Sequence, residues 1–362
     1  MDHPISVDFE KLEKPSARML FGVTESMRKI KLGRFVVKRF AAKAVKAAKR
    51  SGRKRSTTAK LEIVPRTMGF EFDDVPKHWF FESSFGTHVA NGLNLLFPEG
   101  EKYFIRSVAH FAPQLKNEEL RSRVKAFTAQ EVRHGLEHER FFEVLRRQGF
   151  DLERFLSYYP FIAYDVLEKR VYPRKLNLAI TAAAEHYTAT FAETCLRDRH
   201  FPDHAPQQMS DLFMWHAVEE IEHKSVAYDV LQEVDPGYAL RLAGLCVATV
   251  QLMVFWQLGS LMLMRQDKDT SFGRLAREWL MAVKTRRFPA GDYARAFLQF
   301  ASPGFHPSQI HNEKYAREAL AYLSARYAAA RGEKSEETVS RRDGPASSRV
   351  SSARLRPARA SV

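Results

Sequence analysis

The stretch FTAQEVRHGLEHERF, residues 127–141, places ionisable side chains on a helix face that is otherwise apolar. Extended in both directions with a period of about 3.6 residues, the inward stripe of the helix that contains this stretch reads Leu120, Val124, Phe127, Glu131, His134, His138, Phe141, Leu145. Ionised carboxylates cost several kcal/mol to bury unless a countercharge or a metal ion compensates them. The stretch therefore predicts a helix whose core-facing side carries buried Glu and His side chains.

Three other segments show the same interruption of an apolar stripe, and Pro, Asn or Gly marks the helix boundaries. The predicted helices cover about residues 98–112, 117–148, 173–199 and 206–236. The stripe of the first helix is Phe97, Glu101, Phe104, Val108, Phe111. The stripes of the third and fourth are Leu178, Ala182, Glu185, Ala189, Ala192, Leu196 and Phe213, His216, Glu220, His223, Ala227, Val230. Each helix thus contributes at least one acid to a shared core.

The acids and histidines on these stripes form a set typical of a pair of metal ions. A Glu and a His three residues apart project from the same side of a helix and can bind one ion, and the chain contains two such pairs. Four carboxylates balance two divalent cations, and a mixed Glu and His shell suits iron, with manganese or zinc as alternatives. The predicted ligands are Glu101, Glu131, His134, Glu185, His216, Glu220 and His223.

The sequence does not decide whether two further side chains, His138 and Glu219, bind metal. His138 lies one turn beyond His134 and either binds metal or holds a ligand from behind, and we favour the second role. Glu219 competes with Glu220 for a place in the shell, although only Glu220 has the three-residue spacing to His223.

The third helix has an alternative orientation. His186 and Glu193 share a face that is rotated by about one residue from the stripe of Glu185, and they replace Glu185 if the helix is turned that way. A simpler alternative makes all these acids part of solvated helix faces. It requires the Phe, Val and Leu residues of the same stripes to be exposed as well.

Five stretches within residues 66–325 resemble known proteins. They are FPEGEKYFIRSV (97–108), FTAQEVRHGLEHERF (127–141), AAAEHYTATFAE (182–193), WHAVEEIEHKSVAYDV (215–230) and PGFHP (303–307). The chain resembles the ferritin-like di-iron carboxylate superfamily and, more specifically, a bacterial family described as predicted metal-dependent hydrolases. The resemblance implies a ferritin-like four-helix bundle with additional C-terminal helices. Long helical windows without alternating β-branched runs also favour an all-α fold.

Two reactions remain open at such a centre. We expect O2-dependent oxidation of an apolar substrate at paired iron, because hydrolytic sites commonly use Asp-rich shells. The pattern His216-x-x-x-Glu220-x-x-His223 is also similar to the fourth-helix motif of di-iron arylamine N-oxygenases. Metal-dependent hydrolysis is the alternative, which the description of the resembling family favours. Metal storage without catalysis is a second alternative.

The net charge of +14 comes from one short segment. Residues 28–60 hold fourteen Lys and Arg and no acid, so the rest of the chain sums to zero. The segment favours an anionic membrane surface over nucleic acid, because Phe35 and Phe40 are the only aromatic residues among its charges and no recognition motif accompanies them.

A second feature bears on membranes. Residues 242–264, LAGLCVATVQLMVFWQLGSLMLM, contain no charge and are long enough to span a bilayer. Gln251 and Gln257 favour a buried or substrate-channel helix instead, so both alternatives stay open. We expect a cytoplasmic protein, either free or attached to the inner face of the membrane, that acts on a small apolar or lipid-like substrate. The sequence does not indicate an oligomeric state.

These features predict three regions. Residues 1–65 form a basic arm that is partly disordered or lies on a membrane surface, and residues 66–331 form the helical di-metal domain with a very apolar helix at 238–265. Residues 332–362 are rich in Ser, Arg, Ala and Pro and form a disordered tail. Cys195 and Cys246 lack metal-type spacing and are expected to be free thiols.

Overall fold

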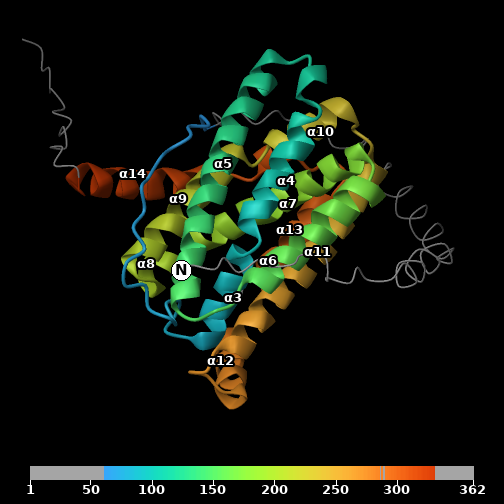
Figure 1. The fold of residues 1–362 in the computed structure, drawn as a ribbon. Coiled ribbons are helices and arrows are strands. Elements are labelled where there is room, and N and C mark those ends of the chain that lie inside the picture. Colours follow the sequence, from blue (N-terminus) through green and yellow to red (C-terminus); the bar gives the residue numbers. More distant parts are fainter. Residues whose placement is uncertain (1–60, 286, 288–289, 331–362) are drawn as a thin grey trace, which may run out of the picture. The chain divides into compact units, whose positions relative to one another are not determined.

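The computed structural model describes residues 61–285, 287 and 290–330, and over these residues the predicted all-α fold is confirmed, without a strand. The chain divides into two compact units, residues 1–321 and 322–362. The first unit is shown in Figure 1 with its helices labelled. The part of the predicted basic arm at 1–60 and the predicted disordered tail at 332–362 lie outside the described residues.

Four helices surround the predicted ligands. They are α4 (Phe97–Ala109), α5 (Glu118–Arg147), α7 (Arg174–Arg197) and α9 (Gln207–His223). In this bundle α4 packs on α5, α5 on α9, α9 on α7, and α7 on α4. The sequence marks their starts clearly: Pro98 occupies the first turn of α4, and the Asn117 side chain accepts a hydrogen bond from Leu120 N at the start of α5. Whether this bundle is ferritin-like stays a prediction.

The fourth predicted helix is divided in the structure. Helix α9 ends at His223, and α10 (Val226–Val234) begins after a turn at Lys224 and Ser225. Lys224 is buried, and its ammonium group donates to the carbonyl of Ile310 at 2.8 Å and to Glu313 Oε1 at 2.9 Å. The turn therefore directs a buried cation to oxygen partners, which a straight helix would not have provided.

The remaining elements cover the bundle and extend it. They are α3 (Ser84–Asn94), η2 (Ala112–Gln114), α6 (Glu153–Pro160), the π-helical segment η3 (Phe161–Val171), α8 (His200–His204), α11 (Tyr238–Gln266), α12 (Phe272–Lys284), α13 (Ala290–Ala301), η4 (Pro307–Gln309) and α14 (Glu313–Ala330). Helix α14 crosses the boundary between the two units.

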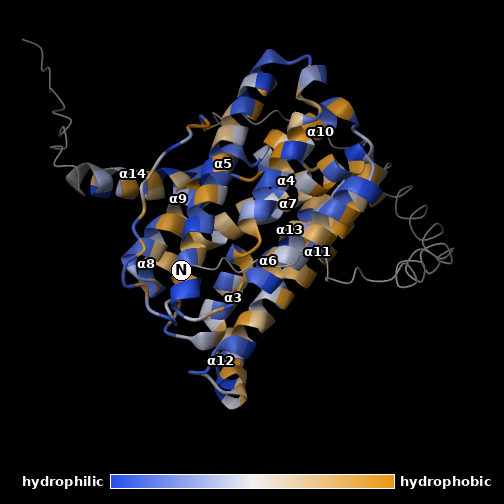
Figure 2. Ribbon diagram, in the orientation of Figure 1, coloured by the Kyte–Doolittle hydropathy of each residue, from blue (hydrophilic) through white to orange (hydrophobic). Residues whose placement is uncertain are grey.

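The apolar helix α11 packs on α7 and α3 along one side only. Its approach to α7 is so close that a Cβ atom at Gly244 would lie 2.5 Å from the backbone of Ala179. The opposite side exposes Val250, Val254, Leu258 and Leu261. By length and composition alone α11 could cross a membrane, and 33% of its most apolar window is buried. Figure 2 shows the hydrophobic residues along α11 and α12.

Candidate metal centre

The bundle brings all seven predicted ligands together in its buried interior. Helix α4 supplies Glu101, α5 supplies Glu131 and His134, α7 supplies Glu185, and α9 supplies His216, Glu220 and His223. Six of the seven belong to four overlapping groups, one of which also includes His138, and the ligand atoms of each group lie within 4.8 Å of one another. The seventh, Glu185, lies 3.3 Å from Nε2 of His223. So many adjacent ligand atoms suit two ions rather than one.

Unpartnered polar atoms are concentrated in this cluster. Among the described residues, seventeen buried side-chain nitrogen or oxygen atoms lack a hydrogen-bond partner, and ten of them belong to five acids and histidines of the cluster and to Glu219 beside it. They include both carboxylate oxygens of Glu101, Glu131 and Glu185. Buried polar groups are nearly always hydrogen-bonded in folded proteins. So many buried oxygen and nitrogen atoms without a hydrogen-bond partner at one place fit a site that binds cations.

The amide of Gln130 fixes the orientation of His223. Its Nε2 donates to Glu222 Oε2 at 2.8 Å and to the carbonyl of Val64 at 3.3 Å, so its Oε1 must face the histidine. Nδ1 of His223 lies 2.9 Å from that oxygen and therefore carries the proton that it donates. Nε2 of the neutral ring consequently presents a lone pair to the cluster, as metal-binding histidines do.

Three carboxylates surround this nitrogen of His223. Its Nε2 lies 3.2, 3.3 and 3.4 Å from oxygens of Glu131, Glu185 and Glu220. Burial opposes a charge on the ring, but Glu220 and Glu185 overcome this effect and raise the pKa of His223 to about 9. The carboxylates thus attract a cation to Nε2, and either a proton or a metal ion can occupy that position.

His216 is held by His138, which is held in turn by α3. Nε2 of His216 lies 2.9 Å from Glu220 Oε1 and 4.0 Å from Glu101 Oε1. Its Nδ1 contacts Nε2 of His138, whose Nδ1 contacts Oδ1 of Asn94. Both ring nitrogens of His138 are therefore engaged within the protein, which favours a positioning role for His138 over direct metal binding.

Glu219 lies beside the cluster but is engaged from outside it. One of its oxygens accepts hydrogen bonds from Trp215 Nε1 at 3.0 Å and from the backbone and side chain of Arg66. The other lies 3.2 Å from Nε2 of His134. Burial raises the pKa of Glu219 to about 7, even though the Arg66 charge acts in the opposite direction. Glu219 is thus placed to orient His134 rather than to replace Glu220.

The structure turns α7 so that Glu185 faces the cluster, and His186 and Glu193 do not. His186 is buried against α13, where its Nε2 lies 3.0 Å from the carbonyl of Ala296. Glu193 lies 3.6 Å from Arg197 and 3.6 Å from Arg295 and accepts a hydrogen bond from Asn312. The alternative orientation of this helix is therefore not the one observed.

The acids of the cluster cannot all be ionised without added positive charge. Burial, together with neighbouring carboxylates, raises the pKa of Glu101 and of Glu131 well above the usual value. Burial also raises the pKa of Glu185 to about 8. In contrast, His223 and His216 hold the pKa of Glu220 well below its usual value despite burial. Two divalent ions would supply the charge that lets all four carboxylates ionise together.

A glycine allows α4 to place its acid in the cluster. A Cβ atom at Gly135 of α5 would lie 3.0 Å from Glu101 Oε2 and 3.7 Å from the backbone of Pro98. A side chain at this position would require the Glu101 carboxylate to shift within the cluster. The glycine thus explains how two helices approach closely enough for their ligands to meet.

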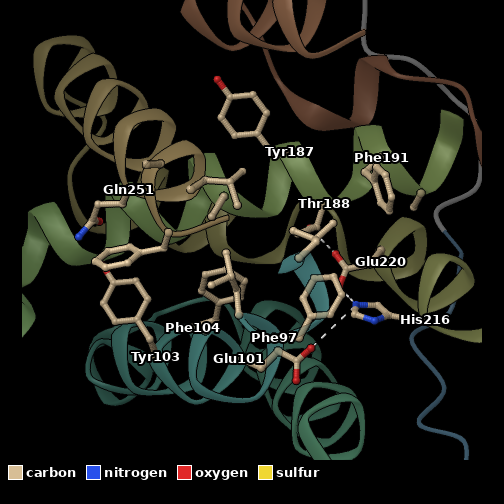
Figure 3. Close-up of a pocket in the computed structure, with 18 of the residues that line it drawn as sticks. Phe97, Glu101, Tyr103, Phe104, Tyr187, Thr188, Phe191, His216, Glu220 and Gln251 are labelled. Atoms are coloured by element: carbon tan, nitrogen blue, oxygen red, sulfur yellow. Dashed lines mark hydrogen bonds and ion pairs between the residues drawn. The ribbon is translucent and has the colours of Figure 1, made fainter. Parts of the chain in front are cut away.

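An apolar cavity opens on one side of the cluster, and we call it the metal-side cavity. Its empty volume is about 1120 Å³, including the space at its mouth. Figure 3 shows Glu101, His216 and Glu220 lining it next to Phe97 and close to Thr188. Most of the other lining residues are aromatic or aliphatic, among them Phe104, Tyr164, Phe191, Leu252 and Phe255. The hydroxyl of Thr188 donates to Glu220 and fixes one of its oxygens. Three of the seven predicted ligands therefore line an apolar cavity.

Several residues that support the cluster were not predicted from the sequence. They are Asn94, Gln130, Gly135, Thr188 and Arg66. Gln130, Gly135 and Thr188 lie next to residues of the predicted stripes, so their position in the sequence is the one local signal that points to them. Asn94 and Arg66 come from segments outside the four predicted helices and meet the cluster only through the tertiary fold.

Comparison with known proteins gives one match. A family model described as "predicted metal-dependent hydrolase" matches residues 64–311. No curated protein and no solved structure matches the chain. The match supports metal dependence and the hydrolase alternative, whereas it lends no support to oxidation as the main reaction or to iron as the metal.

Proposed function

Because the chain belongs to the family of predicted metal-dependent hydrolases, we propose that it binds two divalent metal ions and hydrolyses an ester or amide bond of an apolar substrate. The observation that carries this proposal is the cluster of unpartnered, buried Glu and His atoms beside an apolar cavity. The seven predicted residues would hold the ions. Iron, manganese and zinc all suit such a mixed shell.

The chemistry divides between the ions and the chain. When bound, the ions would polarise the substrate carbonyl and lower the pKa of a water molecule. In the reaction, the water oxygen bonds to the carbonyl carbon, the bond from that carbon to the leaving oxygen or nitrogen breaks, and the leaving atom gains a proton. Glu101 lines the cavity with both oxygens unpartnered, so one oxygen would be available to a metal ion and the other is placed to accept the proton of water and pass it to the leaving atom.

The cavity walls select and orient the substrate. Aromatic side chains such as Phe97 and Phe104 exclude water from the space next to Glu101 and favour an apolar chain. Thr188 holds one oxygen of Glu220, so that the cavity-facing side of the cluster stays rigid. An apolar acyl group in the cavity would therefore place its carbonyl at the Glu101 and His216 side.

O2-dependent oxidation at two iron ions is a second candidate. The donor set favours it, because four carboxylates and three imidazoles suit redox-active iron as well as hydrolytic metals. The apolar cavity would also hold a hydrocarbon beside such a centre.

The two candidates are separated by metal substitution. Protein purified without a metal-binding tag is loaded with zinc, manganese or iron and assayed without oxygen on esters and amides of apolar acids. Hydrolysis by the zinc or manganese form, lost in Glu101→Gln, supports the proposal. Absence of hydrolysis with every metal, together with oxygen consumption by the reduced iron form alone, would overturn it in favour of oxidation.

A further inference from the structure

Helix α12 carries an apolar face that does not pack on the protein. Within the part of the chain that the structure describes, none of its residues is buried. Four of its exposed apolar residues recur at helical spacing, Phe272, Trp279, Leu280 and Val283, and a fifth, Met281, is exposed beside them. An amphipathic helix on the surface of a water-soluble protein normally packs its apolar side on the core. The apolar side of α12 is exposed instead, which is typical of a surface that binds a partner or a membrane.

The helix is nevertheless held firmly to the bundle. Glu278, on its opposite side, accepts hydrogen bonds from Ser83 Oγ and from the backbone N–H of Phe85, each at 2.8 Å. Arg274 pairs with the same carboxylate at 2.7 Å. This polar attachment to the start of α3 fixes the orientation of α12 and keeps its apolar face directed outward.

Exposed cations lie on α12 and in the segments that adjoin it, together with one exposed acid, Asp269. The exposed basic residues of α12 and the segments next to it are Arg265, Lys268, Arg277, Lys284 and Arg287. A helix with exposed Trp and Leu on one side and Lys or Arg at its edges is typical of segments that lie in the interface of a bilayer. The positive charges complement anionic lipid headgroups.

A second cavity connects α12 with the interior, and we call it the α12 cavity. Its empty volume is about 780 Å³, and its walls include Glu278, Ala282 and Arg287 near α12. The α12 cavity and the metal-side cavity share five lining residues, which are Leu93, Phe191, Cys195, Phe201 and Phe213. Only a layer of these side chains therefore separates the α12 cavity from the metal-side cavity.

We propose that α12 docks on an anionic lipid surface and that the α12 cavity admits the acyl chain of a lipid ester to the metal-side cavity. The docking part stands on α12 alone. The substrate part rests on the proposed hydrolysis, because it assigns a long-chain acyl ester as the substrate of that site. An acyl chain that passes the shared apolar layer meets no charged group until it reaches Glu101, His216 and Glu220.

A second copy of the chain fits this face less well than lipid. A helix of thirteen residues presents a face about 20 Å long and 10 Å wide, or about 200 Å², whereas a stable interface takes about 800 Å² from each partner. A symmetric contact through α12 would also bring the cations of two copies, among them Arg277 and Lys284, to one interface. Anionic headgroups relieve this repulsion.

Local fluorescence tests the docking. The exposed Cys246 is replaced by Ser in the full-length chain, and a polarity-sensitive dye is attached to Leu280→Cys or, as the control, to Leu136→Cys on α5. The two leucines are matched, with exposed fractions of 58% and 57%. On vesicles of equal parts phosphatidylcholine and phosphatidylglycerol, the dye at position 280 should shift to shorter wavelength and the dye at 136 should not.

Two results would overturn the docking. If the labelled protein floats with vesicles but neither dye shifts, another segment binds lipid and α12 does not. If the dye at 280 shifts with rising protein concentration in the absence of vesicles, the face binds a second copy instead.

Activity tests the substrate. The rate on a long-chain acyl ester in these vesicles is divided by the rate on a soluble short-chain ester, so that folding and metal loading cancel. Leu280→Glu should lower this ratio about tenfold, because the docked helix loses apolar burial and gains a buried charge, whereas Leu136→Glu should leave it unchanged. An equal ratio in both variants contradicts the route through α12. Absence of any ester hydrolysis refutes the substrate along with the proposed function, while the dye result still decides the docking.

Discussion

At the scale of single residues, the chain controls how the histidines of the cluster present their nitrogen atoms. The amide nitrogen of Gln130 donates to Glu222 and Val64, so its oxygen faces His223 and accepts a hydrogen bond from Nδ1 of that ring. His138 plays a comparable part for His216. Partners of this kind commonly change metal affinity as strongly as some ligands do.

The first prediction concerns Gln130→Leu. The variant removes the acceptor for Nδ1 of His223, so the ring can rotate or change tautomer and the metal dissociation constant should rise about 10- to 100-fold. Gln148→Leu on the same segment is the control, since its amide donates only to the carbonyl of Val75, away from the cluster. Competition with a coloured chelator measures both. Equal affinities for the two variants would mean that the ring of His223 is not a ligand.

The helical period predicted which acids and histidines meet in the buried cluster, because it places each of them on an apolar stripe. It left Glu185 and His186 as alternatives, since rotation of a helix by one residue is not fixed by its own sequence. Contacts from α13 and from Asn312 settle the rotation by binding His186 and Glu193. Those partners are more than a hundred residues away along the chain, so no local pattern could reveal them.

At the scale of helices, the charge balance of the cluster ties bundle stability to pH and metal. The pKa of Glu185 is raised to about 8 and that of His223 to about 9, both above their usual values. As the pH rises, the unfolded chain therefore loses these two protons first. The folded protein without metal keeps them up to a higher pH. Stability contributed by a raised pKa is present below the unfolded value and is lost as pH rises through the folded one.

We therefore predict that the metal-free protein loses thermal stability between about pH 6.5 and pH 9, by roughly 5 °C or more. Metal-loaded protein should not follow this trend, because ions replace the bound protons and bind more tightly as the ligands deprotonate. Thermal unfolding after chelation and after reloading measures both. A melting temperature of the metal-free form that rises over this range would contradict the charge balance described for the cluster.

The contact between α11 and α7 is the second helix-scale feature with a clear test. A Cβ atom at Gly244 would lie 2.5 Å from the backbone of Ala179, so Gly244→Ala should destabilise the protein by about 1–3 kcal/mol. Gly273→Ala on α12 is the control, because nothing lies within 4 Å of its Cβ position and alanine favours a helix there. Chemical unfolding of both variants measures the difference. If Gly244→Ala is neutral, α11 does not pack on α7 and the membrane-spanning alternative gains weight.

The division of the fourth predicted helix shows the limit of sequence patterns at this scale. The apolar stripe continues from His223 through Ala227 and Val230, so periodicity predicts one helix over the whole span. The turn at Lys224 depends on oxygen partners at Ile310 and Glu313, which only the folded chain brings there. Proline and asparagine at the starts of helices, in contrast, act locally and marked α4 and α5 well.

At the scale of the whole molecule, the net positive charge lies in one basic segment, and the charges of the remaining residues sum to zero. The fourteen Lys and Arg of residues 28–60 account for the entire excess charge of +14. Their structure lies outside the described residues, so the binding of this segment to anionic membranes stays a prediction. This prediction is independent of the docking proposed for α12, which lies among the described residues.

Removing residues 1–60 should weaken binding to anionic vesicles and leave the metal content unchanged, because all seven predicted ligands lie beyond this segment. Added salt should weaken binding of the full-length chain more than that of the shortened chain, since exposed charges are screened beyond about 8 Å at physiological ionic strength. Vesicle sedimentation over a salt series measures this. Identical salt dependence of the two chains would show that the basic segment does not contact lipid.

The central claim is that the four helices bind two metal ions in one shared Glu and His cluster. Elemental analysis of protein expressed with ample metal and purified without a metal-binding tag tests it most directly. We predict about two ions per chain, a severe loss in Glu131→Ala, and a smaller loss in His138→Ala, because the oxygens of Glu131 have no hydrogen-bond partner, whereas Asn94 and His216 engage both ring nitrogens of His138. A reproducible content of one ion or fewer in the unmodified chain would contradict the account.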